Sequence, residues 1–166
     1  NGKLSSDRSL SRNQYPALTL ALGKEGNKGL EGLAYDLEGD RLFVTKERDP
    51  RQLLEVSGLR ASLTGGFSLH VRDLSSLVKD KVFATDLSSV VFDQQSGHLI
   101  LLSDESKLLI EMTDEGTVVS FRSLARGFAG LLKGIPQAEG VTIDDEGYLY
   151  VVSEPNLFYR FTRETD

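Results

Sequence analysis

Three stretches of this chain repeat one pattern of apolar and polar positions. Each begins with a short run that ends in an aspartate, passes through a polar turn into a second apolar run, and continues into a third. The first runs read LEGLAYD, LSSVVFD and AEGVTID, and their final residues Asp36, Asp93 and Asp144 lie 57 and 51 positions apart. A unit of about 50 residues built from short strands is typical of β-propeller blades and related repeat arrays.

The pattern predicts four strands in the first repeat, four in the second and three in the third. They lie near 31–36, 41–46, 52–57 and 66–72; near 87–93, 98–103, 107–113 and 117–121; and near 139–144, 148–152 and 157–162. Turns such as Asp114-Glu115-Gly116 supply the positive φ that hairpins need. The continuously apolar residues 99–102 are typical of a strand buried on both faces. We therefore expect an all-β fold of about three propeller blades, each with four antiparallel strands.

The segments outside the repeats complete the predicted organisation. Residues 1–14 are polar and predict a flexible lead-in, and residues 15–166 form the propeller domain, with repeats near 30–72, 87–121 and 139–162. Residues 16–22, PALTLAL, predict one further strand, which has no earlier strand to pair with. Short helices are predicted at 73–79 and 123–132, between the repeats.

Composition excludes several classes of protein. The 166 residues suit one domain with a real core, and 39% hydrophobic and 27% charged residues are ordinary for a soluble protein. The net charge of -6, with no offsetting basic patch, argues against a general binder of nucleic acid or anionic membranes. No run approaches the roughly 20 apolar residues of a membrane span, and no signal-peptide pattern opens the chain. The absence of cysteine excludes disulfides and thiolate metal sites.

Acidic residues recur where the predicted strands begin and end. Glu31, Ser88 and Glu139 open the innermost strands of the three repeats, and Glu47, Asp104 and Glu154 follow the second strands. Each repeat of a propeller returns to the same faces of the disc, and antiparallel neighbours bring these two sets to one rim. We therefore expect one rim to gather five carboxylates: Glu31, Glu47, Asp104, Glu139 and Glu154.

Crowded carboxylates repel one another, and a hard cation with six to eight oxygen ligands relieves that repulsion. Calcium suits this set better than zinc, because the chain has no cysteine and only two histidines, His70 and His98. In the competing interpretation, these acids cap turns or pair with neighbouring cations such as Lys46, Arg48 and Lys107. Of these three cations, Lys46 and Arg48 are also candidate contacts for an anionic ligand. No catalytic residue is predicted, because no Ser-His-Asp spacing or nucleophile elbow surrounds Ser103 or Ser106.

Several segments are similar to those of a known family. They are NKGLEGLAYD with VTKERDP in the first repeat, DLSS with LSDES in the second, and IPQAEGV with SEPN in the third. From about Tyr15 to Phe161 the chain thus resembles the SdiA-regulated family of bacterial β-propellers. The resemblance implies a six-bladed propeller of uncertain biochemical role with calcium binding. It also implies a place in the envelope of Gram-negative bacteria, in the periplasm or anchored to the inner membrane and facing the periplasm.

The resemblance covers the later half of the family pattern, and three blades cannot close a ring that needs about four to eight. One hypothesis is a homodimer that completes a six-bladed ring, in which residues 16–22 of each chain complete the third blade of the other. The alternative is that residue 1 marks a boundary within a longer protein. Any signal or membrane anchor would then lie upstream of Asn1.

Three functions fit these observations. The preferred one is a non-enzymatic, envelope-associated propeller that binds a ligand or protein partner, with calcium at the mouth of the channel. A calcium-dependent hydrolase, phytase-like or lactonase-like, would use the same metal to activate water. A metal-free structural interaction module is the third. Fold alone does not choose among them, because propellers carry many activities.

Overall fold

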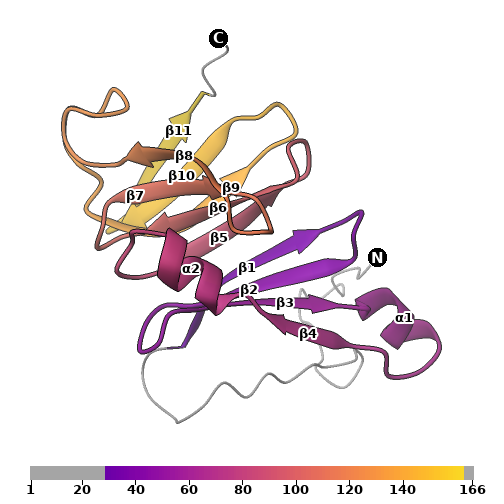
Figure 1. Ribbon diagram of the computed structural model, residues 1–166. Helices are drawn as coiled ribbons and strands as arrows, with labels where there is room; N and C mark the ends of the chain where they lie inside the picture. Colours follow the sequence, from indigo (N-terminus) through magenta and orange to yellow (C-terminus); the bar gives the residue numbers. More distant parts are fainter. Residues whose placement is uncertain (1–28, 163–166) are drawn as a thin grey trace.

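The computed structural model describes residues 29–162, which form three antiparallel sheets and two short helices (Figure 1). The lead-in 1–14 and the strand predicted at 16–22 lie outside the described residues. The first sheet contains β1 (Leu30–Asp36), β2 (Arg41–Lys46), β3 (Gln52–Ser57) and β4 (His70–Asp73). The second contains β5 (Ser89–Asp93), β6 (His98–Ser103), β7 (Leu108–Met112) and β8 (Val118–Ser123). The third contains β9 (Gln137–Ile143), β10 (Leu149–Glu154) and β11 (Leu157–Phe161).

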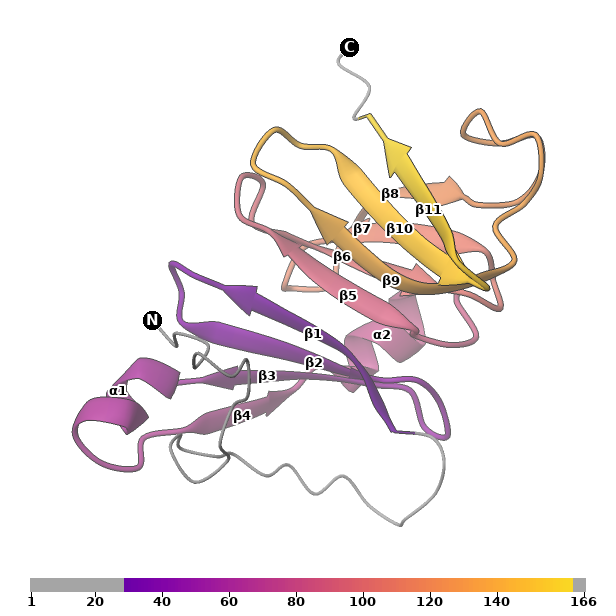
Figure 2. The same ribbon diagram turned by 180° about the vertical axis from the view of Figure 1, so that it is seen from behind.

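Every sheet is a simple meander in which strands adjacent in sequence pair side by side. The orders are β1-β2-β3-β4, β5-β6-β7-β8 and β11-β10-β9, and all pairs are antiparallel. The three sheets follow one another in sequence order, with β1, β5 and β9 along one side (Figure 2). The all-β class and the antiparallel sheets of four strands that the sequence predicts are therefore confirmed, as blade-like units.

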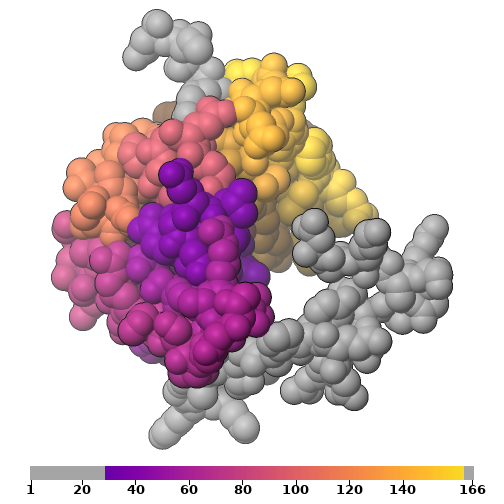
Figure 3. Space-filling model, turned by 90° about the vertical axis from the view of Figure 1, so that its right-hand side faces the viewer, coloured from indigo at the N-terminus to yellow at the C-terminus, as the bar shows by residue number. Residues whose placement is uncertain are grey.

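Two apolar layers hold the sheets together, and the second sheet contributes to both. Phe43 and Leu53 of the first sheet pack with Leu99 and Leu101 of β6, and helix α2 (Ser75–Lys81) inserts the buried Val78 into this layer. The opposite face of β6 places Ile100 and Leu102 against the third sheet, where they belong to one buried cluster with Val141, Val151 and Phe161. The apolar run at 99–102 is thus buried on both faces, as its pattern predicts. Figure 3 shows the three sheets as adjoining surfaces.

The two helices, one strand and one loop differ from the prediction. Residues 124–132 form a loop of bends and turns, and the helix predicted at 123–132 is wrong, because Gly127, Ala129 and Gly130 all adopt positive φ. The helix predicted at 73–79 exists as α2, two residues later. Helix α1 (Leu59–Thr64) was not predicted, since it buries none of its side chains and carries no amphipathic pattern. The strand expected at 66–72 is the shorter β4, which begins at His70.

Candidate functional site

The innermost strand of each sheet is irregular at the same repeat position. In the pairing of β1 with β2 the register shifts between Leu30 and Gly32, so that Glu31 is the extra residue. In the pairing of β9 with β10 the partners of Val152 and Ser153 are Gly140 and Ala138, so that Glu139 is the extra residue. Such β-bulges re-aim a side chain and occur frequently beside functional sites.

The second sheet has a related irregularity at the equivalent position. Ser89 lies opposite Leu102, and the N–H of the preceding Ser88 donates to the carbonyl of the same leucine at 2.9 Å. Glu31, Ser88 and Glu139 therefore leave the regular ladder at equivalent points of the three repeats. The spacing of the repeats predicts that these residues are equivalent, but the bulges themselves depend on strand pairing and were not predicted.

These irregular positions border a polar cavity of about 280 Å³. Its lining residues are Glu31, Glu47, Arg48, Asp86, Ser88, Asp104, Gln137 and Glu139. Four of the five carboxylates that the sequence predicts at one rim therefore line one cavity. The fifth, Glu154, is not part of the lining, but its charge acts on Glu139.

Glu139 has the clearest electrostatic perturbation of these acids. Its partial burial raises the pKa of its carboxyl, and repulsion from Asp104, Glu154, Glu31 and Glu47 raises that pKa further, in this order of size. All four of the other predicted carboxylates thus act on one group. Mutual repulsion of this kind is the physical condition under which a cation would bind favourably.

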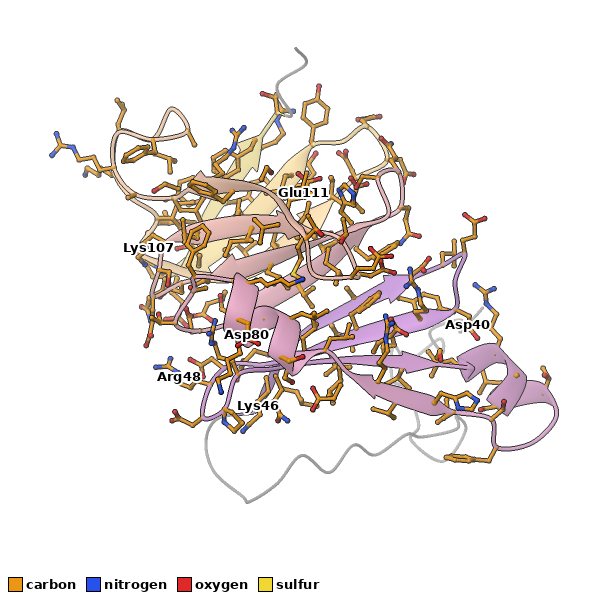
Figure 4. All side chains as sticks on the ribbon, in the orientation of Figure 1. Asp40, Lys46, Arg48, Asp80, Lys107 and Glu111 are labelled. Carbon is orange, nitrogen blue, oxygen red and sulfur yellow. The ribbon has the colours of Figure 1, made fainter. Side chains whose placement is uncertain are left out.

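The two predicted anion contacts are engaged within the protein. Arg48 donates hydrogen bonds to the carboxylates of Glu47 and Glu105 and forms ion pairs with both. Lys46 donates from Nζ to the carbonyl oxygen of Asp49 at 3.1 Å. Figure 4 shows Lys46 and Arg48 at the same side of the molecule as Lys107, away from Asp40. In this arrangement Arg48 neutralises part of the acidic rim, as in the competing interpretation of the carboxylates.

Comparison with known families decides the relationship of this chain. A family model described as SdiA-regulated matches residues 3–162, which is nearly the whole chain. The chain belongs to the SdiA-regulated family. The resemblance found in the repeat segments is therefore confirmed.

Asp104 joins the second sheet to the third in this SdiA-regulated chain. Its Oδ1 accepts hydrogen bonds from the backbone N–H of Ala138 and from Lys107 Nζ, both at 2.7 Å. Lys107 also donates to the carbonyl oxygen of Pro136. Asp104 therefore has a structural role at the junction of the sheets. Both hydrogen bonds to its carboxylate use Oδ1, so Oδ2 is the oxygen that a further ligand would contact.

Asp86 is the acidic residue of the cavity that the sequence analysis missed. It is almost fully buried and accepts a hydrogen bond from the Ser103 hydroxyl, and its Oδ2 accepts one from the N–H of Asp104 at 3.1 Å. It accepts a further one from the N–H of Glu105 at 3.2 Å. The equivalent residues of the other repeats, Gly29 and Gln137, are not acidic, so the repeat gave no signal for Asp86.

Among residues 29–162 of the SdiA-regulated chain, no group of three or more His, Cys, Asp or Glu side chains has the arrangement of a metal-binding cluster. Within the same range, neither helix has the length and apolar character that a membrane crossing needs. His98 lies at the start of β6, whereas the cavity lies at its end, and its Nδ1 is 2.8 Å from Glu111 Oε1. His98 thus belongs to a separate pair at the far rim.

Proposed function

We propose that this SdiA-regulated protein is a non-enzymatic binding module that holds a calcium ion in the acidic cavity. The ion then binds an anionic group of a ligand or protein partner. The observation that carries the proposal is that four of the five predicted carboxylates, contributed by all three sheets, line one polar cavity, and that the other four together raise the pKa of Glu139.

The donor chemistry of the cavity fits calcium. Its lining offers carboxylate oxygens, the Ser88 hydroxyl and the Gln137 amide oxygen, and calcium takes six to eight oxygen ligands. Glu31 and Glu139 would hold the ion, because they occupy exposed bulges and their side chains make no ion pair with another residue of the described range 29–162. Asp104 and Glu47 would complete the set as the contacts with Lys107 and Arg48 rearrange.

A bound calcium ion would cancel the repulsion around Glu139 and present coordination positions to an incoming oxygen ligand. The preference for binding over hydrolysis rests on Ser103, which ends β6 directly before Asp104. Its side chain is buried and its hydroxyl donates to Asp86. This arrangement supports a structural role for that hydroxyl.

We place this binding function in the bacterial envelope, on the periplasmic side, as the resemblance of the repeat segments implies. Calcium sites that work outside the cytosol operate at dissociation constants of about 10⁻⁴–10⁻³ M. A site formed by exposed glutamates suits that range. Fractionation of cells that express the protein from its own gene would show it in the periplasmic or membrane fraction.

The test of the calcium proposal compares thermal unfolding in excess calcium and in EDTA. At calcium about 100 times the dissociation constant, the folded state should gain about 2.7 kcal/mol, which raises Tm by several degrees. The double variant Glu31→Gln/Glu139→Gln should lose this rise. The matched control is Glu38→Gln/Glu146→Gln, which removes two exposed glutamates from the turns at the opposite ends of β1 and β9.

The control variant should keep the full response to calcium. If calcium and EDTA give the same Tm in the unaltered protein, the cation site does not exist and a metal-free interaction module remains. If calcium binds and the protein also hydrolyses phosphate esters or lactones with loss of activity in EDTA, the non-enzymatic assignment is wrong and the hydrolase is correct.

A further inference from the structure

A second cavity, which we call the basic pocket, adjoins the acidic cavity. Its volume is about 550 Å³, compared with about 280 Å³ for the acidic cavity, and small-molecule sites occupy about 300–1,000 Å³. Three cations, Arg48, Arg51 and Lys79, and two acids, Asp49 and Asp73, line it. In a chain with a net charge of -6, this lining has the reverse balance of charge.

The basic pocket is formed by the connections within the first sheet and from the first sheet to the second. Its lining residues lie at 48–52, around the start of β3; at 73–79, at the end of β4 and in α2; and at Thr85, before β5. Arg48 lines both cavities, so the two share a wall. Figure 4 shows Arg48 and Asp80, a residue of α2, at the same side of the molecule.

Arg51 is half-buried, yet little of its hydrogen-bonding capacity is used. A guanidinium has five N–H donors. Within residues 29–162 its one hydrogen bond is a long one, from Nη1 to the carbonyl oxygen of Val82 at 3.5 Å, and it forms no ion pair there. A partly buried charge without a partner is unfavourable, so the pocket favours an anion beside Arg51.

Helix α2 adds a second cation and a hydroxyl group from one face. Ser75 and Lys79 are four positions apart, which places them on the same face of the helix. Lys79 is exposed and forms no ion pair within the described part of the chain. Ser75 Oγ accepts a hydrogen bond from the Leu53 N–H at 3.2 Å, so its hydroxyl keeps its donor for a ligand. Asp73 Oδ1 is turned to the Ser75 N–H at 2.8 Å.

We propose that the basic pocket binds a phosphate group, held by Arg51, Lys79 and the hydroxyl of Ser75. A guanidinium fork matches two phosphate oxygens, an ammonium adds a point charge, and a hydroxyl donates to a further oxygen. The assignment makes no use of the N-terminus of α2, which has seven residues. The phosphate group belongs to a soluble phosphate monoester or to a lipid headgroup, since both present the same chemistry.

The first experiment titrates the ¹⁵N-labelled full chain with glycerol 3-phosphate in EDTA and follows the amide resonances. Signals from the β2–β3 turn and from α2 should shift and saturate together. Arg51→Gln/Lys79→Gln should weaken binding at least about tenfold, because it removes two charge-assisted contacts. Arg126→Gln/Lys133→Gln is the matched control, since it removes the same two charges from the exposed β8–β9 loop, and it should bind like the parent.

Competition separates a phosphate site from general screening of charge. Sulfate, which is also a tetrahedral dianion, should displace the probe, whereas chloride at equal ionic strength should not. The proposal is overturned if glycerol 3-phosphate does not bind, if both double variants bind it like the parent, or if chloride competes as well as sulfate. Should Arg51→Gln/Lys79→Gln fail to fold, Lys79→Gln alone, at an exposed position, should still weaken binding severalfold.

A sedimentation assay distinguishes the two sources of the phosphate group. Phosphatidylcholine vesicles with and without phosphatidic acid are mixed with the protein in EDTA. Sedimentation that needs phosphatidic acid, and that Arg51→Gln/Lys79→Gln abolishes while the control variant keeps it, identifies a headgroup. Binding of glycerol 3-phosphate without sedimentation identifies a soluble ligand. Sedimentation that Arg51→Gln/Lys79→Gln retains in full excludes the headgroup. Because every step is run in EDTA, the outcome is independent of the proposed calcium site.

Discussion

Glu139 is an acidic residue at a position where the folded chain disfavours its negative charge. Its side chain occupies a bulge beside the cavity, and burial together with four nearby carboxylates raises its pKa. A raised folded-state pKa means that the folded protein binds a proton there more tightly than the unfolded chain does. The contribution of Glu139 to stability is therefore favourable at low pH and is lost as the pH rises through its folded-state pKa.

Glu139→Gln should consequently raise Tm at pH 7 in the absence of divalent cations. Screening at this exposed side chain keeps the gain below about 1 kcal/mol, or about 1–3 °C. The gain should disappear near pH 3, well below the ordinary glutamate value, where the carboxyl is protonated in both states. Calorimetry at the two pH values measures it, and an unchanged Tm at pH 7 would show that the repulsion is relieved by rearrangement.

At the far rim, the cation Arg41 lowers the pKa of two neighbouring carboxyl groups, those of Asp36 and Asp114. Its guanidinium pairs with Asp36 at 2.8 Å and with Asp114 of the second sheet, and it stacks over the rings of Phe43 and Phe92. Burial alone would raise the pKa of Asp36, but hydrogen bonds from the Gly39 N–H and from Arg41 lower it. The hydrogen bond from Arg41 is also the main reason that the pKa of Asp114 is low.

Arg41→Met should cost about 1–3 kcal/mol at pH 7, because it leaves two carboxylates without their cation between the sheets. Carboxyl groups with lowered pKa stabilise the fold above about pH 3.9, and that stabilisation is lost as the pH falls through their folded-state values. Urea titrations should therefore show a smaller difference between variant and parent near pH 3. Arg60→Met, at an exposed pair 3.8 Å from Asp40, should change stability by less than about 0.5 kcal/mol.

At the scale of elements, the bulged inner strands decide where the acidic side chains point. The strands β1 and β5 approach each other so closely that a Cβ at Gly32 would lie 2.2 Å from Thr45 Oγ1 and 2.8 Å from the backbone nitrogen of Val90. Gly32 follows the bulge at Glu31, so the close approach and the position of the glutamate depend on the same residue. A side chain here would have to move backbone, which is costly in a packed layer.

Gly32→Ala should accordingly destabilise the protein by about 1–3 kcal/mol and weaken the calcium response that Glu31 is proposed to provide. Gly65→Ala is the matched control, because its Cβ would have no neighbour closer than 4.0 Å. Chemical denaturation of the two variants gives the comparison. Equal stability of both would mean that β1 moves away from β5 without cost.

The elements also show where sequence patterns are informative. Strands with strong apolar patterns and glycine turns, such as β2 and β6, lie at their predicted positions. The helix predicted at 123–132 failed because its apolar residues serve a loop: Leu124 and Ile135 are buried and joined by a hydrogen bond from the Ile135 N–H to the Leu124 carbonyl at 3.0 Å. Phe128 and Leu132 of the same segment are exposed, so its apolar composition predicted neither the backbone conformation nor the burial of every apolar side chain.

At the scale of the whole molecule, three sheets in sequence order bring together residues more than 100 positions apart. Glu31 and Glu139 come from the first and third sheets, and the second sheet contributes Ser88 and Asp104 between them. Calcium at the cavity, the ligand and the place in the envelope stay predictions for the experiments described above.

The sequence by itself determined the repeat, most of the strands, the family and four of the acids that line one cavity. Repetition makes this possible, because equivalent positions of equivalent units return to equivalent places. Only the tertiary structure decided that Glu31 and Glu139 sit on bulges, that buried Asp86 organises the turn after β6, and that Arg48 pairs with Glu47 and Glu105. These features depend on strand register and on contacts between sheets, which occur between residues distant in sequence and leave no local pattern.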